Sequence, residues 1–223
     1  MKTALRRMYQ RLFTAFGPQQ WWPAETPFEV MVGAILTQNT NWTNVEKAIR
    51  NLKGARVLTP QALRRLTPAR LSRLIRPAGY YNVKAKRLRH FLDYFCRRYG
   101  GDPRKMMLRE AARLRKELLA VNGIGPETAD SILLYALGKP VFVVDAYTKR
   151  ILGRHGLAPA SADYSTVQAL FQENLCRRPQ FFNEYHALLV RLGKEYCRTS
   201  KPRCTSCPLG RPRFMRSDRR NHA

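Results

Sequence analysis

The chain has 223 residues, of which 44% are hydrophobic, so it can bury a sizeable core in one compact unit or in two closely packed lobes. It carries 41 Lys and Arg against 15 Asp and Glu, a formal net charge of +26, which indicates a protein that binds a polyanion. It has no run of about 18 apolar residues and no signal-peptide core, so we expect neither membrane insertion nor export, but a cytoplasmic, nucleoid-associated protein.

The N-terminal segment predicts an amphipathic helix followed by a tryptophan-containing loop. Residues 2–16 place their apolar side chains on one stripe, and a Gly-Pro pair ends the helix. The loop then contains Trp21 and Trp22. Adjacent tryptophans are commonly packing anchors, although an aromatic face can also form the wall of a base pocket by stacking and cation–π contact.

A nearly continuous apolar helix is predicted next, over residues 28–36, and it suits the centre of an all-helical lobe. The polar run TQNTN follows and breaks this helix. Asn41, the last residue of the run, is a candidate cap for a helix over residues 42–52.

Three further helix starts share one signature, in which a capping side chain precedes proline. They lie at Thr59, Thr67 and Asp102. Between them, a helix opening at Asn82 has an apolar stripe that we expect to include Val83. The cations on this helix predict either contacts along a DNA backbone or a solvated face, and they are Lys84, Lys86, Arg87 and Arg89. No segment here has the pattern of a strand ladder, so the fold class is predicted to be all-α.

A glycine-bracketed turn joins two predicted helices, residues 108–121 and 126–137. Gly123 and Gly125 allow positive φ and close backbone approach, while Ile124 between them anchors the turn inward. The pattern predicts a helix-hairpin-helix whose backbone N–H groups can bind one phosphate. An ordinary turn between packed helices is the alternative.

Asp145 follows the apolar, β-branched run VFVV and precedes another helical segment. An aspartate in this place is commonly an N-cap. A carboxylate can also act in catalysis, by orienting water and by stabilising positive charge that develops in a reaction. Both roles are compatible.

The C-terminal segment predicts helices over residues 164–175 and 181–196. His186 on the second helix is interpreted as a buried, hydrogen-bonded histidine rather than a metal ligand or a base. Beyond it, three cysteines form the pattern C-x6-C-x2-C, which in a reducing compartment indicates a metal site rather than disulfides. They are Cys197, Cys204 and Cys207.

The segments VNGIGPETAD, VFVVDAYTKRIL, WWPAETPFEVMVGAILTQNTNW and RPAGYYNVKAKRL together resemble the endonuclease III superfamily of helix-hairpin-helix DNA glycosylases, and especially its bacterial 3-methyladenine branch. The resemblance covers roughly residues 21–207. It implies a two-lobed all-α fold with the active site in the cleft between the lobes. One lobe would comprise residues 25–138 and the other residues 1–24 with 139–223.

The resemblance also implies roles for single residues. Gln38 matches a wedge that fills the hole left by an extruded base, and Trp42 matches an aromatic residue that stacks on that base. Asp145 matches the catalytic carboxylate. The base pocket is expected to include Trp21, Trp22, Trp42 and Glu127. The DNA-binding residues are expected to be Gln38, Asn122, Gly123, Ile124, Gly125 and Thr128.

Glu127 distinguishes two mechanisms. In the bifunctional members the matching residue is a lysine that forms a Schiff base and goes on to cut the strand, which a carboxylate cannot do. We therefore expect a monofunctional glycosylase, with Glu127 lining the pocket of a cationic base such as 3-methyladenine or 7-methylguanine, or simply satisfied at a helix start.

The cysteine pattern departs from the iron–sulfur members of the superfamily, because the place of their fourth cysteine is Arg213. The sequence favours a residual or atypical [4Fe–4S] cluster. Such a cluster would be held by the three thiolates and a non-cysteine ligand such as Asp218 or His222. The alternatives are zinc with such a ligand, or a loop that has lost its metal.

Together these features predict a DNA N-glycosylase, a monomer that acts on double-stranded DNA containing a damaged base and does not bind membranes. One alternative is a bifunctional glycosylase/lyase for oxidised pyrimidines, which Glu127 disfavours. The other is a non-catalytic helix-hairpin-helix DNA-binding protein, which Asp145 disfavours.

Overall fold

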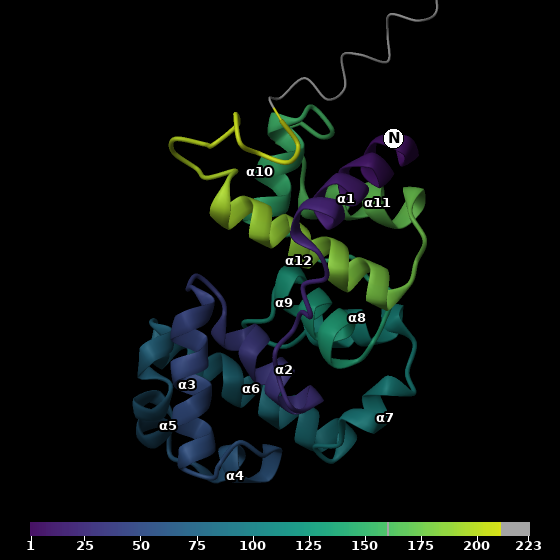
Figure 1. Cartoon of the computed structure of the whole chain (residues 1–223). Coiled ribbons are helices and arrows are strands. Elements are labelled where there is room, and N and C mark those ends of the chain that lie inside the picture. Colours follow the sequence, from purple (N-terminus) through teal and green to yellow (C-terminus); the bar gives the residue numbers. More distant parts are fainter. Residues whose placement is uncertain (160, 211–223) are drawn as a thin grey trace, which may run out of the picture. The chain divides into compact units, whose positions relative to one another are not determined.

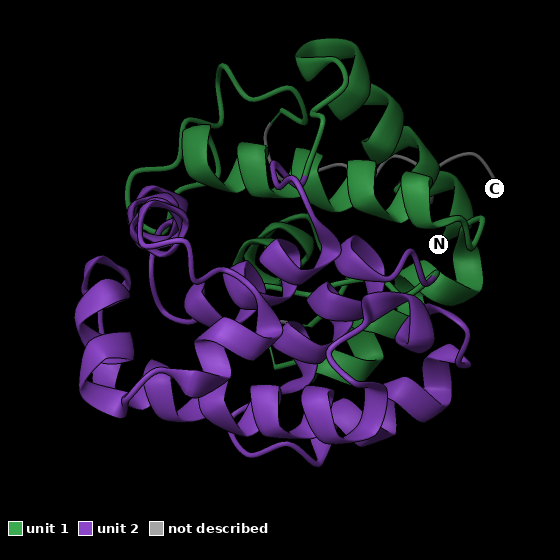
Figure 2. Ribbon diagram, turned by 90° about the horizontal axis from the view of Figure 1, so that it is seen from below, with its two compact units in different colours: residues 1–21, 140–223 green, residues 22–139 purple. Residues whose placement is uncertain are grey.

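The computed structural model describes residues 1–159 and 161–210, and these residues form helices and loops with no strand (Figure 1). The predicted all-α fold class is confirmed. The chain divides into two compact units, one of Met1–Trp21 with Pro140–Ala223 and one of Trp22–Lys139 (Figure 2). No helix in the described part of the chain is both long enough and apolar enough to cross a membrane.

The unit of residues 22–139 is a cluster of mostly short helices. They are α2 (Pro27–Leu36), α3 (Trp42–Gly54), α4 (Pro60–Arg65), α5 (Pro68–Leu74), the 3-10 turn η1 (Arg76–Ala78), α6 (Tyr81–Tyr99), α7 (Pro103–Met107), α8 (Ala111–Leu119), α9 (Pro126–Ser131) and the π-helical turn η2 (Ile132–Ala136).

The helix starts in this unit are set by local side-chain caps. Thr59, Thr67 and Asp102 each accept a hydrogen bond from a backbone N–H two or three residues ahead, and Asn41 does the same for α3. A proline follows three of these four caps, where its missing N–H costs nothing. All four predicted caps are confirmed.

α2 is the centre of this unit, because it is buried on every side from Phe28 to Leu36. It packs against α3, α6, α9 and η2. A helix that is apolar all round has this position in a helical core. The wedge candidate Gln38 therefore follows the most buried helix of the unit, which gives that loop a rigid support.

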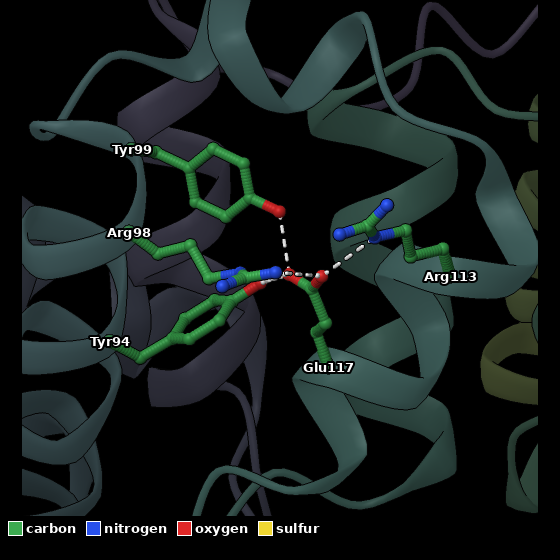
Figure 3. Close-up of polar contacts among 5 residues, drawn as sticks. All are labelled: Tyr94, Arg98, Tyr99, Arg113 and Glu117. Carbon is green, nitrogen blue, oxygen red and sulfur yellow. Dashed lines mark hydrogen bonds and ion pairs between the residues drawn. The ribbon is translucent and has the colours of Figure 1, made fainter.

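α6 and α8 are joined by a polar cluster around Glu117 (Figure 3). The carboxylate accepts hydrogen bonds from the hydroxyls of Tyr94 and Tyr99 at 3.0 and 2.6 Å, and from Arg98 at 3.1 Å. Arg113, four residues before Glu117 on α8, donates at 3.2 Å. Burial alone would raise the pKa of Glu117, but these donors outweigh it and lower the pKa to about 2.

In the other unit, the described residues form four helices: α1 (Lys2–Phe16), α10 (Ala146–Arg154), α11 (Tyr164–Asn174) and α12 (Pro179–Glu195). α12 packs against α1 and α10, and the hydroxyl of Tyr185 on α12 donates to the carbonyl of Leu5 on α1 at 2.8 Å. The run VFVV is buried, and Phe142 within it stacks on Phe171 with ring centroids 3.7 Å apart. This run delivers Asp145 to the start of α10.

Three helix predictions are corrected by the structure. Val83 does not lie on the buried stripe of α6, because its side chain is 46% exposed, whereas Lys84 beside it is 1% exposed. The helix expected to begin at residue 108 begins at Ala111, because Leu108 ends α7 and points into solvent. The helix expected over residues 126–137 changes from α-helical to π-helical at Ile132.

Candidate functional site

The hairpin between α8 and α9 has the tight geometry that its glycines predict, with one correction. Gly123 has φ +88°, in the left-handed region that favours glycine. Ile124 is 4% exposed and is anchored inward, so it can meet a ligand only through its backbone. Gly125 is extended, with φ −89°, and not left-handed. An added Cβ there would have no heavy atom within 4 Å, so Gly125 keeps an open face at the hairpin tip.

A buried ion pair holds the two helices of the hairpin together. Arg115 on α8 donates to both carboxylate oxygens of Asp130 on α9, at 2.7 and 3.1 Å, and Asp130 is fully buried. Parallel hydrogen bonds of this kind fix the orientation of both groups. The sequence interpretation did not include this pair, because nothing in the spacing of the two residues indicates it.

Gln38 is brought onto the hairpin. Its Nε2 donates to the carbonyl of Gly123 at 3.0 Å and to the hydroxyl of Thr128 at 2.9 Å. Thr128 is buried, so its side chain contacts Gln38 within the protein. Asn122 is exposed, and its carbonyl lies 3.3 Å from Nδ1 of His90.

Trp22 and Trp42 lie together in the unit of residues 22–139. Their rings meet edge to face, with centroids 4.8 Å apart and planes at 85°. Trp22 also packs against Tyr135, with ring centroids 5.1 Å apart. Behind it lies Gly33 of α2, where an added Cβ would be 3.3 Å from the indole. Tyr135 and Gly33 were not among the predicted site residues, since each is apolar or small and resembles an ordinary core residue.

The two tryptophans line a cavity of about 310 Å³ that carries charged groups. One is Glu29, whose side chain is 9% exposed and which forms a 2.9 Å ion pair with Lys53. The complete lining is Trp22, Pro23, Ala24, Glu29, Trp42, Glu46, Ile49, Arg50 and Lys53.

The other two predicted pocket residues are not part of this lining. Trp21 belongs to the other unit, where the ammonium of Lys194 lies 5.8 Å from its ring centroid. Glu127 is exposed in the first turn of α9.

Asp145 has two environments, one for each carboxylate oxygen. Oδ1 accepts a hydrogen bond from the backbone N–H of Thr148 at 2.7 Å, which makes Asp145 the N-cap of α10. Oδ2 lies 3.6 Å from Nε2 of His186. His186 is buried, as predicted, and burial lowers its pKa while the nearby Asp145 carboxylate opposes that shift. The sequence did not indicate that these two residues are neighbours.

The cysteine loop is held by arginines of α10. Arg150 donates to the carbonyl of Cys197 at 2.7 Å, and Arg154 lies 3.4 Å from the sulfur of Cys197. Burial raises the pKa of the Cys207 thiol. Within residues 1–159 and 161–210, no three His, Cys, Asp or Glu side chains are arranged to hold a metal ion.

The loop supplies three thiols, Cys197, Cys204 and Cys207, which is one fewer than a four-thiolate cluster requires. The other positions considered for this site, Arg213, Asp218 and His222, lie outside the described residues.

A protein-family model and individual relatives place this chain in the same family. Residues 32–177 match the family described as HhH-GPD superfamily base excision DNA repair protein. The chain is 47% identical over 204 residues, 91% of this chain and 92% of the relative, to a Methanocaldococcus jannaschii protein whose name gives DNA repair glycosylase as a provisional activity. It is 30% identical over 186 residues to endonuclease III of Thermotoga maritima, covering 82% of this chain and 80% of the relative.

Two solved structures are similar. A 3-methyladenine DNA glycosylase of H. pylori, solved with 1,N6-ethenoadenine bound, has a TM-score of 0.74 and 29% identity over 87% of this chain and 95% of its own. An endonuclease III–DNA complex has a TM-score of 0.80 at 22% identity, covering 94% of this chain and 93% of the other, and shows the likeness of fold.

Proposed function

Because this chain belongs to the HhH-GPD superfamily of base excision DNA repair proteins, and is a DNA glycosylase, we propose that it is a monofunctional enzyme that removes alkylated purines from double-stranded DNA. The observation that carries the proposal is the cavity lined by Trp22 and Trp42. The similarity to the H. pylori 3-methyladenine DNA glycosylase supports the same substrate class.

The cavity suits a flat, positively charged ring. An alkylated purine such as 3-methyladenine or 7-methylguanine carries a positive charge before its bond is cut, and indole faces attract cations. Trp22 is held between Gly33 and Tyr135, so it presents a fixed surface to a ring. The acids Glu29 and Glu46 and the bases Arg50 and Lys53 in the lining balance in formal charge, so the preference for a cation rests on the indole rings.

Asp145 is proposed as the catalytic carboxylate. When the bond between base and sugar breaks, the base leaves with the bonding electrons, and positive charge develops on the sugar. The carboxylate stabilises that charge and accepts a proton from the water whose oxygen bonds to the sugar carbon. An N-alkylated cationic purine leaves as a neutral base and needs no proton donor. The cap to Thr148 fixes the carboxylate, and Oδ2 is the oxygen directed toward His186.

The product is proposed to be an intact strand with an abasic site. Glu127 has a carboxylate where the bifunctional members have a nucleophilic lysine, so no Schiff base can form at that position. No step of the reaction is assigned to the cysteine loop. Iron analysis of the purified protein tests for the predicted atypical cluster.

The partner is proposed to be double-stranded DNA that contains the damaged base, bound by a monomeric protein in the cytoplasm or nucleoid. The net charge of +26 supports a polyanionic partner. Extrusion of a base is least costly when that base is damaged or mispaired, which supplies part of the selectivity.

The test uses three proteins: wild type, Asp145→Asn and Glu127→Lys. Each is incubated with duplexes that carry a 3-methyladenine analogue, hypoxanthine or thymine glycol, and strand breaks are scored directly and after alkali. We expect wild type to release the alkylated purine, with breaks only after alkali. Asp145→Asn should bind the same duplex without releasing the base.

Two results would point elsewhere. Breaks without alkali would support the bifunctional alternative and would mean that a lysine other than one at position 127 attacks the sugar. Binding without release of any base would support the non-catalytic alternative. Glu127→Lys tests the position itself, because a gain of strand cleavage in that variant would show that a lysine there reaches the sugar.

A further inference from the structure

Arg87 on α6 joins the Gln38 loop to the hairpin. Its Nη1 donates to Oε1 of Gln38, while Nε2 of the same amide donates to Gly123 and Thr128. Both ends of the Gln38 amide are therefore bound, one by α6 and the other by the hairpin.

The absence of a side chain at Gly123 is part of the same contact. An added Cβ would overlap Cγ of Arg87 and would lie 2.8 Å from its Cδ. The aliphatic part of Arg87 thus runs directly beneath the hairpin, in space that only glycine leaves free. The left-handed φ of +88° is a second reason for glycine at this position.

Lys84, one turn earlier on α6, supports the segment that leads to Gln38. Its buried ammonium donates to the carbonyl of Leu36, the last residue of α2, at 2.8 Å, and to the carbonyl of Ala78 at 2.6 Å. A cation is favourable at the C-terminal end of a helix. Lys84 and Arg87 together fix the backbone before Gln38 and the amide at its tip.

We propose that Arg87 is a positioning residue that holds Gln38 docked on the hairpin, so that the wedge is preset before the protein meets DNA. This inference rests on the proposed function, in which Gln38 fills the gap left by the extruded base. Presetting removes the need to order a flexible glutamine at the moment of extrusion. It also couples the two segments, because a phosphate bound at the hairpin and a wedge entering the stack belong to one rigid network.

The test separates extrusion from binding. Extrusion is followed in an Asp145→Asn background by the fluorescence of 2-aminopurine placed opposite the lesion, and binding by anisotropy on an undamaged duplex. For Arg87→Met we expect the extrusion equilibrium to fall by about tenfold, the loss typical of one hydrogen bond to a charged group. Binding to the undamaged duplex, where no base is extruded and no gap forms, should change by less than about threefold, on the order of 0.6 kcal/mol.

Matched variants identify the cause. Lys86→Met removes one positive charge from the exposed face of the same helix, and it should reduce binding to both duplexes equally without a selective loss of extrusion. The double variant Gln38→Ala with Arg87→Met should extrude no worse than Gln38→Ala alone, because the two residues act as one unit. Arg87→Lys keeps the charge and most of the stem, and it serves if Arg87→Met does not fold.

The inference is overturned if Arg87→Met extrudes the base as well as its parent, or if the losses from Arg87→Met and Gln38→Ala simply add. Equal loss on both duplexes would also overturn it, because that would identify a plain phosphate contact. Since 2-aminopurine reports extrusion without cleavage, a failure of the proposed glycosylase activity would be seen separately, as wild type that extrudes a base and does not release it.

Discussion

One oxygen of Asp145 caps α10 and the other lies 3.6 Å from His186, so a single side chain serves the fold and, in the proposed function, the reaction. Asparagine retains an oxygen that can accept the Thr148 N–H, and it caps helices about as well as aspartate. Alanine removes both properties. The two substitutions therefore separate the structural role of the residue from its chemical role.

We expect the free energy of unfolding of Asp145→Asn to be nearly that of wild type. The free energy of unfolding of Asp145→Ala should be lower by about 1 kcal/mol, the typical cost of losing an N-cap. Both should lose base release. Urea unfolding followed by circular dichroism measures the difference. An alanine variant as stable as the asparagine variant would show that the cap contributes nothing to stability.

His186 makes the stability of the protein depend on pH. Its pKa is lowered by burial, so the folded protein binds a proton at His186 less readily than the unfolded chain, whose histidines titrate near 6.5. The free energy of unfolding should therefore fall as pH falls from about 6.5, because the unfolded state takes up the proton first. His155 is also buried with a lowered pKa, and it contributes in the same direction.

Urea unfolding at pH 7.5 and at pH 5.5 tests this. His186→Gln should lose part of the decrease seen in wild type, and the remainder should disappear when His155→Gln is added. If the double variant keeps the full dependence on pH in this window, other groups control it.

At the scale of helices, the hairpin depends on two polar links that lie on either side of α8. The carboxylate of Asp130 on α9 accepts hydrogen bonds from Arg115. The carboxylate of Glu117 accepts hydrogen bonds from two tyrosines and two arginines (Figure 3). Both acceptors are carboxylates that would be costly to bury alone. Each link fixes α8 to a neighbour, so the orientation of the hairpin is set by charge pairing as well as by apolar packing.

Glu117 should protect the protein at moderately acidic pH. Its pKa is lowered to about 2 in the folded state, from about 4.5 when unfolded. The stabilisation is complete above about pH 4.5 and is lost as pH falls through about 2, because the carboxylate must then be protonated. Glu117→Gln should be less stable at pH 7, by about 1–3 kcal/mol, and should show less change in unfolding free energy between pH 5 and pH 3.

Asp93→Asn is the matched control for this prediction, since Asp93 of α6 forms an exposed ion pair with Arg64 of α4. Exposed pairs contribute little. Equal effects of Glu117→Gln and Asp93→Asn would contradict the role assigned to the cluster.

Sequence features that involve only a few neighbouring residues, such as helix caps, predicted this structure well. Contacts between residues far apart in the chain were not predicted. The caps at Asn41, Thr59, Thr67 and Asp102 could be predicted because each depends on hydrogen bonds within three residues of the chain. On α6, the prediction for Val83 was wrong because the buried place beside it belongs to Lys84, whose ammonium reaches a carbonyl 48 positions away.

The candidate site follows the same division. The glycines of the hairpin could be recognised from the sequence. The hydrogen bond from Arg87 to Gln38 spans 49 positions, and the hydrogen bond from Gln38 to Gly123 spans 85, so neither could be predicted from neighbouring residues. Charge patterns and helical periodicity describe neighbours along the chain and do not indicate which distant residues meet. These contacts therefore become visible only in the folded structure.

For the whole molecule, the net charge of +26 predicts binding to undamaged duplex DNA that weakens steeply with salt. Each phosphate neutralised contributes a slope of about −0.9 in a plot of log affinity against log salt concentration. We expect a slope that indicates several phosphate contacts, and we expect Gln38→Ala to leave it unchanged because glutamine releases no counterions. Anisotropy titrations between about 50 and 200 mM salt measure it. A slope near zero would contradict electrostatic binding.

The unit of residues 1–21 and 140–223 is assembled from two distant pieces of chain, while the unit of residues 22–139 is continuous. On the ribosome, the apolar stripe of α1 emerges long before its partner α12, which is 180 positions away at the Leu5–Tyr185 bond. At a synthesis rate of about 5–20 residues per second, roughly 10–40 s pass before α12 is made. During that time no α12 is present to cover the apolar side chains of Leu5, Met8 and Leu12. The unit of residues 22–139 can fold during this interval. For most of its synthesis, the nascent chain therefore exposes the apolar face of α1, which favours aggregation until α12 is made.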